Sequence, residues 1–214
     1  MSTDQDTRAS QPSLTRYDVA GTAAPRGVIV MLHGGKEASQ VAVDDRSLSR
    51  RRSLAMQAAI APAAAEAGLS TWLLSYRVRG WNGGSGPVAD ARWALEQVRR
   101  ELGGVPVALL GHSMGGRTAV HVADDPSVTG VVGLAPWWPT DEPVEALAGK
   151  RLVAAHGRRD KITSYRATGR FVERARDVAT SVEMHDMGPI GHYLLRRVAA
   201  WNEVALTSSL ALLP

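Results

Sequence analysis

The 214-residue chain has no cysteine, which excludes disulfide bonds, a thiolate zinc site and a cysteine nucleophile. Phenylalanine occurs once, and the basic residues are not interleaved with aromatic residues as in proteins that bind single-stranded nucleic acid. No apolar run approaches the roughly 18 residues of a membrane-spanning helix. The polar N-terminus also lacks the apolar segment of a signal peptide. We therefore expect a cytoplasmic protein with no membrane span and no nucleic-acid partner.

Lysine is scarce, and the net charge of +4 and the pI of about 9.8 come from arginine. The arginines are scattered, and the densest run, residues 50–52, is short, so the pattern favours a solvated basic face. The sequence also lacks H-E-x-x-H, a histidine pair at metal-ligand spacing, and G-x-G-x-x-G after its first buried strand. We therefore expect neither a metal nor a cofactor.

Strand patterns and helix patterns alternate along the chain. Continuous β-branched runs such as Gly27–Leu32 are typical of strands buried on both faces. The alternation predicts an α/β fold, a mostly parallel sheet with helices on both faces. We expect residues 1–13 to be a disordered lead-in and residues 14–214 to form a single domain. The expected strands cover residues 14–20, 27–32, 71–76, 105–110, 128–135, 152–155 and 182–185.

The helix patterns fall between these strands. Pro62 lies inside the first of them and predicts either a kink or a helix that begins near it, while Gly68 is a suitable residue to follow the helix end. The charged stretch before it, residues 36–53, is too long for a tight turn and is expected to form part of a lip over the site. The expected helices cover residues 53–67, 87–102, 115–124, 164–176 and 193–206.

An apolar run in the middle of the chain ends in Gly111-His112-Ser113-Met114-Gly115. This G-x-S-x-G pattern between a strand and a helix is typical of a nucleophile elbow. A serine at such a sharp turn presents its hydroxyl clear of the sheet, and the glycines avoid clashes at the turn. The backbone N–H of Met114 would then face a developing oxyanion.

Other polar residues also follow predicted strand ends: the segment 33–35, Asp160 and His192. Right-handed crossovers place the ends of parallel strands at one edge of the sheet, where α/β proteins bind ligands. A serine needs an adjacent base, and an imidazole needs an acid to orient it. The pattern therefore predicts Ser113 as nucleophile, His192 as base and Asp160 as the acid.

The chain order Ser113, Asp160, His192 resembles that of the α/β-hydrolase superfamily. Within it, residues 14–210 look most like small lidless esterases of the dienelactone-hydrolase and lysophospholipase-like type. The resemblance implies an α/β-hydrolase fold and an oxyanion hole formed by Met114 and the loop after the first buried strand. In that loop we favour Gly35, with Lys36 as the alternative.

Several residues compete for these roles. His185 is an alternative base, although it lies within a predicted strand. Asp141 or Glu142 is an alternative acid, because some members of the family carry their acid after the preceding strand. Asp186 is too close to His192 in sequence to approach its ring correctly.

Three tryptophans follow predicted strands: Trp81, Trp137 and Trp138. They would either pack loops onto the sheet edge or form walls of a substrate pocket. Only a short connection separates the strands that end near residue 135 and begin near residue 152, which leaves no room for a helical cap. An open site of this kind favours small or surface-accessible esters.

The sequence therefore predicts a serine hydrolase that cleaves small carboxylic esters through an acyl-enzyme. The same triad could instead serve a thioesterase, a lactonase or an acyltransferase. An alternative of another class is a catalytically silent binding protein, which has the hydrolase fold but does not catalyse the reaction. We expect a small-molecule ester as the partner and a monomer or homodimer as the assembly.

Overall fold

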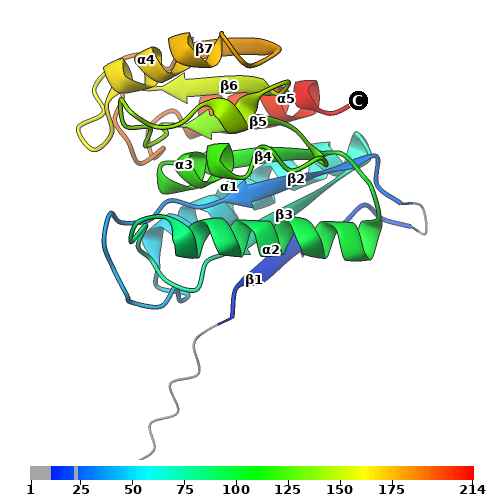
Figure 1. Ribbon diagram of the computed structural model, residues 1–214. Coiled ribbons are helices and arrows are strands. Elements are labelled where there is room, and N and C mark those ends of the chain that lie inside the picture. Colours follow the sequence, from blue (N-terminus) through cyan, green and yellow to red (C-terminus); the bar gives the residue numbers. More distant parts are fainter. Residues whose placement is uncertain (1–10, 22–23) are drawn as a thin grey trace, which may run out of the picture.

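The computed structural model describes residues 11–21 and 24–214, so most of the predicted lead-in lies outside the described residues. The strands form a seven-stranded sheet in the order β1-β3-β2-β4-β5-β6-β7 (Figure 1). β1 pairs antiparallel with β3, and the other neighbours are parallel. The strands are β1 (Ser13–Tyr17), β2 (Gly27–Leu32), β3 (Leu69–Ser75), β4 (Val107–His112), β5 (Val128–Leu134), β6 (Arg151–His156) and β7 (Ser181–Asp186).

Helices cover both faces of this sheet, which confirms the predicted fold class (Figure 1). Two helices, α1 (Leu48–Glu66) and α5 (Val198–Leu212), pack against each other on one face. The opposite face carries α2 (Ser85–Leu102), α3 (Met114–His121) and α4 (Tyr165–Ala175). The parallel strands therefore end together at one edge, where the loops into these helices begin.

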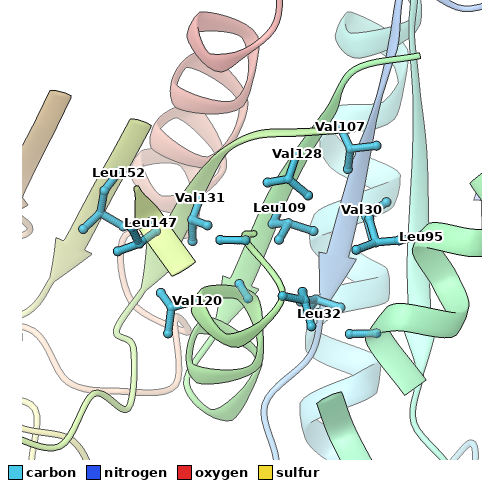
Figure 2. Close-up of a cluster of buried hydrophobic side chains, with 14 of the residues drawn as sticks. Val30, Leu32, Leu95, Val107, Leu109, Val120, Val128, Val131, Leu147 and Leu152 are labelled. Carbon is cyan, nitrogen blue, oxygen red and sulfur yellow. The ribbon is translucent and has the colours of Figure 1, made fainter. Parts of the chain in front are cut away.

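Successive side chains of a β-strand point to opposite faces of the sheet. Each central strand therefore contributes alternate residues to two hydrophobic clusters, one on each face. Val28, Val30 and Leu32 of β2 point into the cluster beneath α2 and α3, where Figure 2 shows Val30 and Leu32 near Leu95 of α2. Ile29 and Met31 of β2 point to the other face. Both faces are buried, so the strand is apolar at every position rather than at alternate ones.

Two helices begin at places that the sequence did not predict. α1 begins at Leu48 rather than at residue 53 and continues through Pro62. Pro62 lacks an N–H, yet tertiary packing of this long helix offsets that missing hydrogen bond. α5 begins at Val198 rather than at residue 193, because Leu194 and Arg197 have φ of 55° and 54°, which no α-helix allows.

The connection between β5 and β6 contains one short 3-10 helix, η1 (Glu145–Leu147). It therefore carries no helical cap domain, as predicted from its length. Within residues 11–21 and 24–214, no helix is long and apolar enough to span a membrane.

Candidate active site

The turn between β4 and α3 holds Ser113 in a conformation that side-chain-bearing residues rarely adopt. Its φ is 54° and its ψ is −117°. Such backbone strain persists only where the surrounding structure enforces it, and it is typical of functional sites. Here two glycines allow the turn: a Cβ on Gly111 would lie 2.4 Å from the backbone of Gly115, and a Cβ on Gly115 would lie 1.9 Å from the carbonyl oxygen of Leu32.

We expect Gly115→Ala to destabilise the protein by about 3 kcal/mol or more, because the added methyl meets immobile backbone of β2. Urea denaturation of the variant would measure the change. Gly169→Ala is the matched control, since Gly169 lies within α4 and a Cβ there meets nothing within 4 Å. That change at a half-buried helical position should stabilise the protein by about 0.5–1 kcal/mol. Equal free energies of unfolding for the two variants would contradict this account of the turn.

The structure brings Ser113, His192 and Asp160 together in one chain of hydrogen bonds. Ser113 Oγ lies 2.9 Å from His192 Nε2, and His192 Nδ1 lies 2.7 Å from Asp160 Oδ2. Ser113 and His192 are 7% and 5% exposed, so both groups are largely shielded from water. With Nδ1–H donating to the carboxylate, Nε2 is free to accept the serine proton.

Asp160 is held as a carboxylate by several donors. Its Oδ1 accepts the backbone N–H groups of Ile162 and Thr163 at 2.8 and 2.9 Å. Its Oδ2 accepts from His156 Nε2 at 3.1 Å and from the Thr163 hydroxyl at 2.9 Å, besides His192. Burial raises the pKa of Asp160, but the hydrogen bonds from His156, His192 and Thr163 outweigh it and hold the pKa well below its ordinary value. The carboxylate can therefore stabilise an imidazolium at His192.

His156 and Thr163 are functional candidates that the sequence analysis did not identify. His156 ends β6 fully buried, with Nδ1 2.8 Å from the Thr168 hydroxyl and Nε2 directed at Asp160. In the sequence, His156 is distinguished only by its place before a glycine at the end of a predicted strand. Nothing in the local pattern distinguishes Thr163 from any other polar loop residue.

Two further histidines near the site are buried and neutral. Burial lowers the pKa of His112 to about 3, and repulsion from the His192 ring in its protonated form lowers it as well. Burial likewise lowers the pKa of His33 to about 4. His112 Nε2 lies 3.1 Å from the backbone oxygen of His192, so its ring supports the segment that carries His192.

Two backbone N–H groups in the loops around Ser113 are candidates for an oxyanion hole. Lys36 N–H already donates to the carbonyl of Arg79 at 2.7 Å, whereas neither Gly35 N–H nor Met114 N–H has a partner in the described part of the chain. A Cβ on Gly35 would lie 2.4 Å from Met114 Sδ and 2.6 Å from Arg79 O. The glycine thus allows the close approach of the loop to the elbow, and the arrangement favours Gly35 over Lys36.

The competing residues lie elsewhere. The Glu142 carboxylate is buried in contact with Arg117 and His121, the ion pair with Arg117 Nε being 2.6 Å. Asp141 is exposed, and His185 on β7 lies 3.8 Å from Glu183. The structure therefore does not bring these alternatives to Ser113.

A cavity of about 560 Å³ opens on Ser113 and His192. Its lining includes Gly34 and Gly35 of the loop after β2 together with His112. The remaining lining comes from the start of α1 and from the segment before α5: Leu48, Ser49, Arg51, Arg52, Tyr193 and Leu195. Of the stretch 36–53 that was predicted as part of a lip, only the last part lines the cavity, and that part belongs to helix α1.

The structure does not bring the three tryptophans to this cavity. Trp138 is buried, stacks on Phe171 and donates from Nε1 to Gly116 O at 3.0 Å. Trp81 and Trp137 enclose the guanidinium of Arg117, which lies 4.5 Å from each ring centroid. Of the two roles considered for the tryptophans, packing of loops onto the sheet edge is therefore the one that these contacts support.

The sequence pattern of the alpha/beta hydrolase fold family matches residues 27–188. The match covers most of the chain, including the elbow and Asp160, and the chain belongs to this family. Among curated proteins, none matches the sequence.

Solved structures share the fold at low sequence identity. An alpha-beta serine hydrolase homologue from Coxiella burnetii is 17% identical, with a TM-score of 0.70 over 92% of this chain and 91% of that chain. A lidless serine hydrolase from Xanthomonas campestris is 17% identical, with a TM-score of 0.65 over 95% of this chain and 90% of that chain. A butyrate-bound esterase from Thermogutta terrifontis is 18% identical, with a TM-score of 0.68 over 96% of this chain and 88% of that chain.

Proposed function

We propose that the protein is a serine hydrolase that cleaves small carboxylic esters through an acyl-enzyme. The observation that carries the proposal is the hydrogen-bonded chain Ser113–His192–Asp160 at a cavity of about 560 Å³. A cavity of this size suits a small-molecule substrate. The names of structural neighbours, which include esterases and serine hydrolases, agree with this reaction class.

In the first half of the reaction, Ser113 Oγ attacks the ester carbonyl while His192 Nε2 takes its proton. Asp160 stabilises the resulting imidazolium through Nδ1–H. The N–H groups of Met114 and Gly35 donate to the oxyanion, and His192 then protonates the departing alcohol. In the second half, water takes the place of Ser113 as the group that His192 deprotonates, and the acid is released.

A fluorophosphonate probe followed by peptide mass spectrometry tests the nucleophile directly. We expect a single adduct on Ser113, with none in a Ser113→Ala variant. A p-nitrophenyl ester series from acetate to decanoate tests the reaction, and its chain-length profile measures the acyl pocket. Labelling of Ser113 without ester turnover would point to thioesters, lactones or acyl transfer. Absence of both would leave the binding-protein hypothesis.

A further inference from the structure

The lining of the active-site cavity contains two arginines and no acidic residue. Arg51 and Arg52 come from the first turns of α1, while Leu48, Tyr193 and Leu195 add apolar surface. These three side chains are 76%, 61% and 69% exposed and gather at one cavity, an arrangement typical of ligand-binding grooves. The cavity therefore combines an apolar wall with positive charge beside Ser113.

The two arginines differ in what they already bind. Arg52 donates from Nε and Nη2 to the carbonyl oxygen of Leu194 at 3.2 and 2.9 Å, which fixes the rim segment to α1. The neighbouring Arg50 pairs with Asp45 at 2.8 Å. Arg51 is exposed, and its guanidinium makes no ion pair or hydrogen bond with residues 11–21 or 24–214. Arg51 is thus the cavity arginine that is available to a ligand.

The start of α1 adds to this positive potential. The helix runs for 19 residues, its first turn has no acidic residue, and the residue at its N-cap makes no side-chain cap. The unbonded N–H groups of a first turn carry partial positive charge, which favours an anion nearby. The nearest acidic residues in sequence, Asp44 and Asp45, are paired with Arg79 and Arg50, and Asp44 also accepts a hydrogen bond from the Ser47 hydroxyl at the N-cap at 2.9 Å. Neither of them neutralises Arg51.

We propose that the cavity selects esters that carry a carboxylate at the end remote from the scissile bond, with Arg51 as the residue that binds this carboxylate. This inference rests on the proposed ester hydrolysis and adds the substrate class to it. A guanidinium binds a carboxylate through a planar pair of N–H donors, and the apolar wall accommodates the carbon chain between the two ends. Arg51 acts in specificity and takes no part in the proton transfers.

Two matched substrate pairs test the inference. On the acyl side, 4-nitrophenyl hydrogen adipate is compared with its neutral methyl ester; on the alcohol side, 4-acetoxybenzoate is compared with 4-acetoxybenzamide. We expect the ratio of kcat/KM for anion over neutral ester to fall about fivefold in Arg51→Gln for at least one pair, since exposed ion pairs contribute on this scale. Arg51→Lys should keep most of the preference. Raising the salt to about 1 M should reduce the wild-type ratio toward that of Arg51→Gln.

Arg100→Gln is the control, because Arg100 is exposed on α2 and does not line the cavity. An unchanged ratio in Arg51→Gln for both pairs would overturn the inference, as would an equal fall in Arg100→Gln, which would indicate net charge alone. Turnover of the neutral esters reports the proposed function separately. If the neutral esters are cleaved and the anion-over-neutral ratio of kcat/KM is the same in Arg51→Gln as in the wild type, only the inference fails. If no ester is cleaved, the proposed function fails and the inference falls with it.

Discussion

Replacing Ser113 with alanine is expected to lower kcat for p-nitrophenyl acetate by about four orders of magnitude or more. The hydroxyl lies 2.9 Å from His192 Nε2, and its loss removes the only atom that could form the acyl-enzyme in the proposed reaction. Residual activity would come from the oxyanion donors acting on water. Initial rates over a range of substrate concentrations would separate kcat from KM.

The fold should survive this change. Alanine carries the same Cβ as serine at φ 54°, so the backbone strain is unaltered, and one hydrogen bond to His192 is lost. Circular dichroism and the urea midpoint should therefore stay close to the wild type. Ser181→Ala, on the exposed edge strand β7, is the matched control and should keep full activity. A Ser113→Ala variant that retains more than about a tenth of wild-type kcat would rule out Ser113 as the nucleophile.

A nearly equal loss in kcat, about 10⁴-fold at pH 7, is expected for Asp160→Asn. The side-chain oxygen of asparagine can still accept the two backbone N–H groups that bind Oδ1, so the loop should keep its shape. The amide NH₂ then replaces Oδ2 and faces the His192 ring as a donor. His192 must accept at Nδ1 and carry its proton on Nε2, where it can no longer take the proton of Ser113.

The pH dependence of kcat tests this explanation against simple misfolding. In Asp160→Asn, His192 is uncharged and carries its proton on Nε2, so it cannot act as the base. Activity should therefore recover partly at alkaline pH, where hydroxide takes the place of the base. Asp177→Asn removes one exposed carboxylate and should leave activity unchanged. A loss below about tenfold in Asp160→Asn would mean that another acid supports His192.

The parts of the fold that follow from local chemistry could be predicted from the sequence. The β2 run fills both faces of a covered sheet, so every position is apolar and its bounds are visible in the sequence. Gly111 and Gly115 mark the elbow because no side chain fits there. The parallel topology brings the carboxyl ends of the strands to one edge of the sheet. It therefore predicts that Ser113 and His192 lie close together, even before their hydrogen bond is known.

The lining of the cavity could not be predicted in this way. Leu48 and Arg51 belong to it because α1 begins before the residue at which its pattern becomes clear. Tyr193 and Leu195 belong to it because Leu194 takes a positive φ and delays α5. Both effects depend on tertiary packing, which overrides local helix preference. For the same reason Trp138, apolar and next to a strand end, lies in the core and away from the cavity.

The short connection between β5 and β6 also has a consequence for the acyl-enzyme of the proposed reaction. Because no cap folds over Ser113 from this connection, and because Leu48 and Leu195 at the cavity are largely exposed, an acyl group attached there would border bulk solvent. Water at its bulk concentration then competes with any alcohol or amine for the acyl carbon. Transfer to such an acceptor needs a dry enclosure to suppress that competition. In the proposed reaction, the open architecture would therefore favour release of the free acid.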